Sequence, residues 1–198
     1  VAGALSLDDA ARVVALRTRE VRRIAGRGGL VSVALAPDEA AAWIEPWAGR
    51  LTVAGVNGPA SVVVGGDLDA LAELVTAGEA GGVRVKRVPI DYASHTDHVE
   101  PLREPLLRLL AGVTGRPSAV PLYSSVTGER LDTTVMDGTY WFRNLREPVR
   151  FDQAIGALPD GAVFLEVSPH PVLTVPLTDL LNAAGRRADV VGTLRRAD

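Results

Sequence analysis

The chain has 198 residues, of which 47% are hydrophobic, with a formal net charge of -3 at pH 7 and no cysteine. The absence of cysteine excludes thiol catalysis, disulfide bonds and cysteine-ligated zinc, and the slightly acidic balance provides no basic surface for nucleic acid. No apolar run is long enough to span a bilayer, so no membrane partner is expected. The absence of cysteine is compatible with the cytoplasm, where we expect the protein to work. The N-terminal residues lack a signal-peptide pattern and suggest a chain that begins in mid-domain.

The first helix is predicted from a capping box at residues 6–9 and is expected to end near Ala25. At 3.6 residues per turn, one narrow face of this helix collects mostly apolar side chains and is expected to be buried. This face consists of Ala10, Val13, Val14, Arg17, Val21 and Ile24. Arg17 is the only charge that the pattern places on it.

The next 60 or so residues alternate strand and helix patterns in the order β-α-β-β-α-β, which is the order of a ferredoxin-like split unit. Strands are expected at residues 30–35, 51–56, 61–64 and 83–90, and helices at residues 37–48 and after an N-cap at Asp67. The dipeptide Asn57-Gly58 predicts a hairpin turn between the second and third strands.

After residue 90, strands and helices alternate again, which suggests an α/β core with helices on both faces. The expected helices are residues 98–113, residues 139–158 with an interruption at Pro148, and residues 176–184. In the first of these, Pro101 and Pro105 place the real start near Pro105 or leave a kink. The expected strands are residues 120–126, 162–167 and 190–194.

Three histidines are candidate functional residues. His95 directly follows a predicted strand, where open α/β sheets bind ligands, so its imidazole is a candidate base; a loop histidine bonded to the backbone is the alternative. His95 and His98 are three residues apart, but no third ligand stands at a suitable spacing, so no metal site is expected. His170 lies between two prolines and is expected to have a structural role in a turn.

The predicted burial of Arg17 is costly unless its guanidinium is paired. A ligand carboxylate bound through two parallel N–H donors is one interpretation, and an internal ion pair is the other. A base also needs a nucleophile, and no serine has the Gly-x-Ser-x-Gly context of a nucleophile elbow. Ser94 is adjacent to His95, but neighbours in an extended segment point in opposite directions.

Several segments, taken in order, resemble the acyltransferase domain of modular type I polyketide synthases. They are residues 1–11, 14–17, 56–59, 92–95, 141–151, 164–171 and 191–196. The resemblance implies an α/β fold, in which part of a hydrolase-like three-layer core (residues 1–27 and 92–198) carries an inserted ferredoxin-like subdomain (residues 28–91). The family's active serine precedes the segment similar to residues 1–5, so we expect it upstream of Val1 and expect this chain alone to be inactive.

The resemblance also implies roles for individual residues. His95 matches the family's catalytic histidine, and Asn144 matches a position whose backbone carbonyl orients that histidine. Arg17 matches the arginine that binds the free carboxylate of a malonyl-type acyl group. Tyr92 and Ser94 belong to a Tyr-Ala-Ser-His motif associated with methylmalonyl selection, because serine in place of the phenylalanine of malonyl-selective domains leaves room for a methyl group.

The implied activity is a two-step acyl transfer in polyketide and antibiotic biosynthesis. An extender acyl group, expected to be methylmalonyl, passes from CoA to a serine and then to the phosphopantetheine thiol of an acyl carrier protein. No metal or cofactor is implied, CoA is a substrate, and neighbouring ketosynthase and linker domains of the same synthase are expected partners. The alternatives are a malonyl-selective or stand-alone acyltransferase, a non-catalytic scaffold or interaction domain of a synthase, and an unrelated α/β-hydrolase fragment, against which the buried charge of Arg17 argues.

Overall fold

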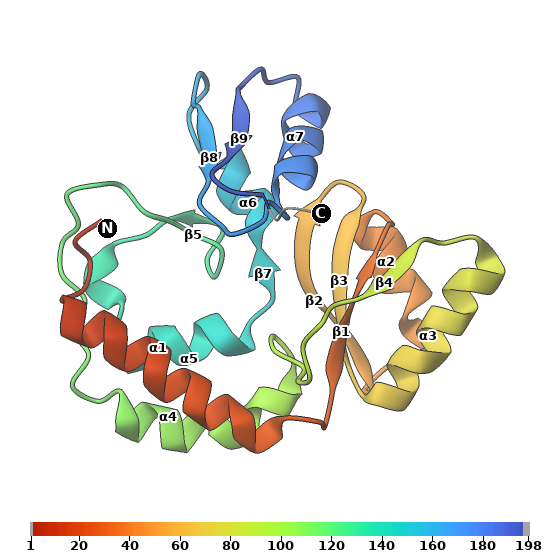
Figure 1. The fold of residues 1–198 in the computed structure, drawn as a ribbon, viewed down its shortest axis with the longest axis horizontal. Helices are drawn as coiled ribbons and strands as arrows, with labels where there is room; N and C mark the ends of the chain where they lie inside the picture. Colours follow the sequence, from red (N-terminus) through yellow and green to blue (C-terminus); the bar gives the residue numbers. More distant parts are fainter. Residues whose placement is uncertain (1, 196–198) are drawn as a thin grey trace.

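The computed structural model describes residues 2–195, which form an α/β fold of helices and small sheets (Figure 1). The α-helices are α1 (Leu7–Val21), α2 (Pro37–Trp43), α3 (Leu68–Gly81), α4 (Arg103–Leu109), α5 (Gly138–Arg146), α6 (Phe151–Gly156) and α7 (Thr174–Ala183). Short 3₁₀ helices are η1 (Arg22–Ile24), η2 (Glu45–Trp47), η3 (Asp97–Leu102) and η4 (Thr133–Val135). The strands are β1 (Gly29–Val33), β2 (Leu51–Gly58), β3 (Ser61–Gly66), β4 (Val85–Arg87), β5 (Tyr123–Ser124), β6 (Glu129–Arg130), β7 (Val149–Arg150), β8 (Phe164–Glu166) and β9 (Val190–Gly192). Val1 and Arg196, with which the family-like segments begin and end, lie outside the described residues.

The five-stranded sheet has the strand order β4-β1-β3-β2-β7. Neighbouring strands are antiparallel except for β7, which joins β2 in parallel. Period-2 alternation explains one buried face, because Val31 and Val33 are fully buried while Ser32 between them is half-buried. Helices α2 and α3 cover this face and share its apolar core. That core contains Val31, Val33, Ala40, Ile44, Leu51, Val62, Val64, Ala70, Leu71 and Leu74.

The turn between β2 and β3 differs from the prediction. Strand β2 continues through Gly58, which pairs with Ser61, so the turn consists of Pro59 and Ala60 and the predicted Asn57-Gly58 turn is wrong. The pairing of β2 with β3 is irregular just before this point, which shifts the register that the hairpin pattern assumes. Pro59 then stands at the corner, where its missing N–H costs no ladder hydrogen bond.

Helices α1, α4 and α5 pack together beside this sheet and enclose a second core (Figure 1). Helix α1 starts at the predicted capping box, where the Ser6 hydroxyl accepts the N–H of Asp9 at 3.0 Å. The second core draws one or more side chains from every helix of this group and from η1 and η3. It consists of Val21, Ile24, Val99, Leu102, Leu106, Phe142 and Leu145.

The buried face of α1 is displaced from the predicted one. Val13 is 3% exposed, as expected, but Val14 is 64% exposed. Glu20 is buried instead and pairs with Arg19 and Arg23, so Arg17 is not the only charge at this face. The reason is angular: Glu20 follows Val13 by two turns and shares its side, whereas Val14 lies at the edge of the stripe.

Prolines divide the later helices. The helix predicted for residues 98–113 is η3, with Pro101 inside it, followed by α4 from Arg103. The helix predicted for residues 139–158 is likewise divided. Pro148 separates α5 from α6, and the short strand β7 lies between them and reaches β2. The end of α5 at this proline positions the candidate active site.

The C-terminal elements form a separate small layer (Figure 1). Strands β8 and β9 pair in parallel, and α6 and α7 pack beside them around Ile155, Leu177 and Leu181. The β8 segment is less buried than its apolar sequence suggests, since Leu165 is 57% exposed. None of the helices in residues 2–195 is long and apolar enough to cross a membrane.

Candidate active site

Arg17 on α1 reaches across to α5. Its Nη1 donates a hydrogen bond to Oδ1 of Asn144 at 2.6 Å, although 127 positions separate the two residues in sequence. Within residues 2–195, no carboxylate lies within the 4.0 Å ion-pair distance of Arg17. The internal ion pair considered as one interpretation of the sequence is therefore absent from this part of the chain, and a neutral amide takes its place.

The amide partner leaves the charge of Arg17 uncompensated. Burial of the guanidinium lowers the pKa of Arg17, an effect that Tyr92 partly opposes, but a guanidinium remains protonated in proteins. It has five N–H donors, and Asn144 fixes its direction through one of them. Arg17 and Tyr92 line the same cavity of about 310 Å³. The site thus presents an oriented positive charge with donors still available.

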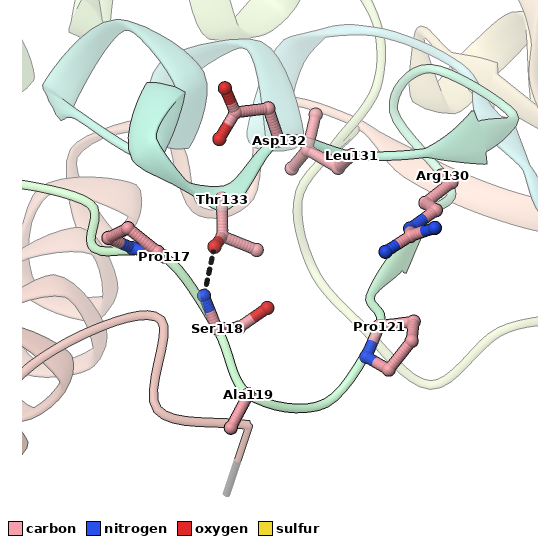
Figure 2. A pocket seen from close by; sticks show the side chains of 8 residues that line it. All are labelled: Pro117, Ser118, Ala119, Pro121, Arg130, Leu131, Asp132 and Thr133. Atoms are coloured by element: carbon pink, nitrogen blue, oxygen red, sulfur yellow. Dashed lines mark hydrogen bonds between the residues drawn. The ribbon is translucent and has the colours of Figure 1, made fainter.

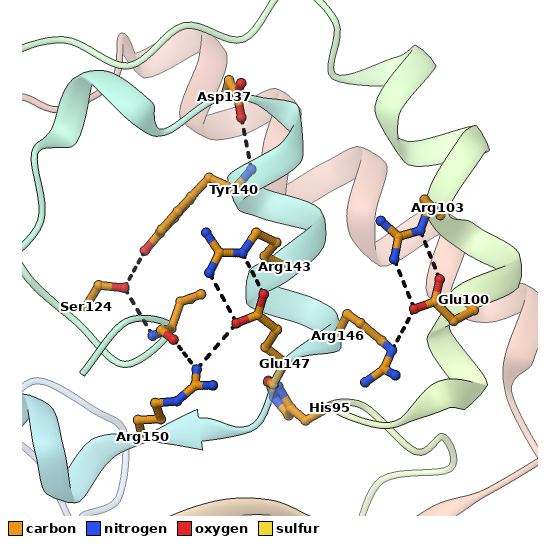
Figure 3. A network of polar contacts seen from close by, with 11 residues as sticks. His95, Glu100, Arg103, Ser124, Asp137, Tyr140, Arg143, Arg146, Glu147 and Arg150 are labelled. Atoms are coloured by element: carbon orange, nitrogen blue, oxygen red, sulfur yellow. Dashed lines mark hydrogen bonds and ion pairs between the residues drawn. The ribbon is translucent and has the colours of Figure 1, made fainter. Parts of the chain in front are cut away.

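His95 is held by the C-terminal end of α5. Its main chain is in the left-handed region, with φ at 60°, and its backbone N–H donates to the carbonyl of Leu145 at 2.8 Å. Its Nδ1 donates to the carbonyl of Glu147 at 2.8 Å (Figure 3). Carbonyls at a helix end lack intrahelical partners, so they are free to accept these bonds. Because a carbonyl only accepts, the proton sits on Nδ1 and Nε2 keeps its lone pair.

The environment of His95 favours the neutral imidazole. Burial lowers the pKa of His95, and the positive charge of Arg17 lowers it further, while the hydrogen bond to the Glu147 carbonyl opposes both effects. A neutral imidazole with a fixed Nδ1–H and a bare Nε2 is the form that takes a proton from a nucleophile. His95 therefore has the protonation state and the tautomer of a general base.

The role expected for Asn144 is wrong in its detail. The carbonyl that accepts from the His95 imidazole belongs to Glu147, and the Asn144 side chain binds Arg17. Glu147 precedes Pro148, a position that disfavours helical geometry, and it is extended at φ -80° and ψ 152°. Its carbonyl therefore turns out of the helix, whereas Asn144 is still inside α5. Pro148 was the sequence signal that could have identified this acceptor.

A polar network that the sequence did not reveal surrounds this carbonyl (Figure 3). The carboxylate of Glu147 binds Arg143 at 2.5 and 3.3 Å and Arg150 at 3.3 Å. A second cluster on the other side of α5 joins Glu100 to Arg103 and Arg146. Most of these pairs join residues three or four apart, which are spacings that a sequence can reveal. Only the fold brings Arg146 to Glu100.

The residues of the Tyr-Ala-Ser-His segment lie close to this site. Tyr92 is half-buried and packs against the second core, and Ser94 is 6% exposed. Thr96 completes the turn by donating its hydroxyl proton to the carbonyl of Ala93 at 2.9 Å. The fold thus brings Arg17, Tyr92, His95 and Asn144 together, and Ser94 precedes His95 as a buried residue.

The other two histidines lie apart from this arrangement. His98 binds Asp67 through Nε2 at 3.0 Å, which ties η3 to the start of α3. Asp67 is the N-cap residue of α3, as predicted, but its side chain makes this contact rather than a capping hydrogen bond. His170 is exposed in the turn after β8. In residues 2–195, no three His, Asp or Glu side chains are grouped as a metal would require.

A second hollow of about 420 Å³ lies where the segment of residues 117–121 passes the loop before η4 (Figure 2). Its walls are joined by a hydrogen bond from the Ser118 N–H to Thr133 Oγ1 at 2.9 Å. The carboxylate of Asp132 is turned to its own loop, where the N–H of Thr134 lowers its pKa. None of the predicted site residues lines this hollow.

Comparison with known proteins gives consistent matches over the whole chain. A family model of the acyl transferase domain matches residues 1–198. The polyketide synthase GfsE of Streptomyces halstedii is 54% identical over 200 residues, which cover 100% of this chain and 5% of that protein. The erythronolide synthase EryA3 of Saccharopolyspora erythraea is 52% identical over 198 residues, which cover 99% of this chain and 6% of that protein.

A solved structure shares the fold. The acyltransferase domain from module 8 of the salinomycin polyketide synthase superposes with a TM-score of 0.94 at 48% identity, covering 99% of this chain and 47% of that one. The chain therefore spans about half the length of this solved relative and a few per cent of the synthases that it matches.

Proposed function

The chain belongs to the acyltransferase domains of modular type I polyketide synthases, of which it covers part, and from this premise we propose that it supplies the general base and the carboxylate-binding residue of acyl loading. The base is His95 and the carboxylate-binding residue is Arg17. The observation that carries the proposal is the pairing of the half-buried Arg17 with the amide of Asn144 rather than with an acid. A charge that is oriented but not neutralised suits a substrate that brings its own carboxylate.

In the proposed reaction, the nucleophile is a serine outside this chain. His95 Nε2 takes the proton of that serine as its Oγ attacks the thioester carbonyl of the extender-CoA, and the imidazolium then protonates the departing CoA sulfur. In the second step, His95 deprotonates the phosphopantetheine thiol of an acyl carrier protein. The thiol attacks the acyl-serine ester, and the serine oxygen recovers the proton as it leaves. The 198 residues alone are then inactive in loading.

The extender is proposed to be methylmalonyl, with malonyl as the alternative. Tyr92 lines the cavity that Arg17 also lines. The proposal rests on the motif of residues 92–95, in which the buried Ser94 stands where malonyl-selective domains have a phenylalanine. A single methyl group contributes about 1–3 kcal/mol to discrimination, so this choice depends on the shape of the cavity wall.

The proposed domain organisation is based on the strand order of the five-stranded sheet. The strand order β4-β1-β3-β2 with two helices on one face supports a ferredoxin-like subdomain at residues 28–91. Residues 1–27 and 92–198 are then parts of a hydrolase-like core that the rest of the acyltransferase domain completes. We expect this domain to work in the cytoplasm beside ketosynthase and linker domains of the same synthase.

The proposal is tested by measuring covalent loading. The complete acyltransferase domain that contains this chain is incubated with methylmalonyl-CoA, and the acyl adduct is measured by intact mass. The wild-type domain should gain one methylmalonyl group, and His95→Ala should lose most of the loading rate. The 198-residue chain should gain none. Unimpaired loading by His95→Ala, or a stable adduct on the 198-residue chain, would contradict the proposal.

A further inference from the structure

At the end of α5, the carbonyl beside the candidate base lacks a restraint that most main-chain carbonyls have. The carbonyl of Glu147 belongs to the peptide bond to Pro148, whose nitrogen has no hydrogen to donate. In an ordinary loop, the N–H of the next residue helps to fix the plane of such a carbonyl. Here that anchor is missing at the group that accepts the hydrogen bond of His95.

The side chain of Glu147 supplies anchors of its own. Its carboxylate accepts from Arg143 Nε at 2.5 Å and Nη2 at 3.3 Å, and from Arg150 Nη1 at 3.3 Å (Figure 3). We call the ion pairs of Glu147 with Arg143 and with Arg150 its two arms. Nη1 of Arg150 also donates to the carbonyl of Val126, so the second arm connects Glu147 to the segment after β5. The arginines hold the pKa of the Glu147 carboxyl below its ordinary value, so both arms persist at neutral pH.

The two arms come from opposite sides of the proline. Arg143 is one turn earlier on α5, whereas Arg150 is in β7, which pairs with β2 of the sheet. The exposed fractions of the three side chains are 28% for Glu147, 44% for Arg143 and 35% for Arg150. A single exposed ion pair would contribute little, but a carboxylate bound by two arginines on two elements restrains its own backbone.

We propose that Glu147 is a positioning residue for the acyl-transfer reaction, and that its carboxylate, held between Arg143 and Arg150, fixes the carbonyl that orients the imidazole of His95. This inference deepens the proposed function and rests on it. The side chain of Glu147 touches no reacting group. It acts through its own main chain, keeping the proton on Nδ1 and the lone pair of Nε2 in place.

The chain contains a matched control on η3, which packs against the same helix. Glu100 in η3 binds Arg103 of α4 at 2.9 and 3.0 Å and Arg146 of α5 at 2.8 Å, so it is also a glutamate held by two arginines. Its carbonyl is not the acceptor for His95. The loss of Glu100 therefore removes an equivalent ion-pair cluster without loosening the imidazole.

The experiment uses the complete acyltransferase domain with Glu147→Gln and Glu100→Gln. Loading is measured as kcat/KM with methylmalonyl-CoA, and the tautomer of His95 is read from side-chain ¹⁵N shifts after ¹⁵N-histidine labelling. We expect Glu147→Gln to lose about tenfold or more in kcat/KM and to show a mixture of Nδ1–H and Nε2–H forms. Glu100→Gln should stay within about twofold of wild type and keep the Nδ1–H form.

The inference is overturned if Glu147→Gln keeps both the rate and the Nδ1–H form, or if both variants change alike. If Glu147→Gln does not fold, Arg143→Met removes the closer arm, and it should give the same tautomer mixture; an unchanged tautomer would reject the inference. Failure of the proposed function gives a different result, because the wild-type domain would then take no acyl group while the ¹⁵N comparison still decides the role of Glu147.

Discussion

At His95, the main chain adopts a left-handed conformation that few residues other than glycine enter. Such backbone costs on the order of 1–3 kcal/mol and persists only where the surroundings fix it. Here the carbonyl of Leu145 accepts the backbone N–H, and the carbonyl of Glu147 accepts Nδ1–H. The position of His95 after a predicted strand was readable in the sequence. Its acceptors were not, because they belong to a helix end some 50 residues away in sequence.

The lowered pKa of His95 predicts how loading depends on pH. Both burial and the charge of Arg17 disfavour the imidazolium, so the base stays neutral at a lower pH than an ordinary histidine of pKa 6.5. We expect kcat/KM for loading of the complete domain to decline only at pH values below 6.5, since this parameter reports the free enzyme. A decline with an apparent pKa above 6.5 would contradict the assigned environment.

The hydrogen bond from Arg17 to Asn144 predicts an unusual response to a nearly isosteric change. Asn144→Asp places a carboxylate 2.6 Å from Nη1, where it pairs with the guanidinium and removes the charge intended for the substrate. We expect loading of methylmalonyl-CoA to fall about 10- to 100-fold, and Asn144→Ala to cost less. Rapid-quench loading kinetics measure both variants. An alanine variant worse than the aspartate variant would show that Asn144 serves only for packing.

On the scale of elements, helical periodicity predicted the existence of α1 and its start at Ser6 but not all of its buried residues. Val13, Val21 and Ile24 are buried as predicted. The period gives a direction for the face, whereas its width depends on the helices that pack against it, here α4 and η3. That information lies outside the helix sequence, so Val14 was assigned wrongly.

Two neighbouring valines of α1 provide a direct test of this face. Val13 is 3% exposed and Val14 is 64% exposed. We expect Val13→Ala to lower the free energy of unfolding of the complete domain by about 1–3 kcal/mol, because it leaves a cavity. Val14→Ala should change it by less than about 0.5 kcal/mol. Urea denaturation measures both, and equal losses would contradict the orientation of α1.

The end of α5 shows what local sequence rules can and cannot provide. Pro148 predicted the interruption, and its effect on the preceding residue explains why the carbonyl of Glu147 leaves the helix axis. The same rules do not say that β7 joins β2, or that Arg150 returns to Glu147. The strand pairing joins segments far apart in the chain. Arg150 is only three residues after Glu147, but it lies beyond the end of α5, where helical spacing gives no rule.

On the scale of the whole molecule, the candidate site joins three segments. Arg17 comes from α1, His95 from the segment between β4 and η3, and Asn144 from α5. The sequence pattern and its family resemblance predicted this set, and in the structure Arg17 and Asn144 are hydrogen-bonded to each other. The catalytic and binding roles of the set stay a prediction. The partner of Arg17 was left open between a ligand and an internal acid. Helical periodicity predicts the face on which a side chain lies, but it does not predict which group lies opposite that face.

The most direct test of the account compares two substrates that differ only in a carboxylate. Methylmalonyl-CoA and propionyl-CoA are loaded on the complete domain, with Arg17→Ala beside Arg12→Ala, an exposed arginine of the same helix. We expect Arg17→Ala to slow methylmalonyl loading by about 10- to 100-fold and to leave propionyl loading nearly unchanged, so the preference for methylmalonyl-CoA over propionyl-CoA falls. Arg12→Ala should affect neither substrate. Equal losses for both substrates in Arg17→Ala would contradict the assignment of Arg17 as the carboxylate-binding residue.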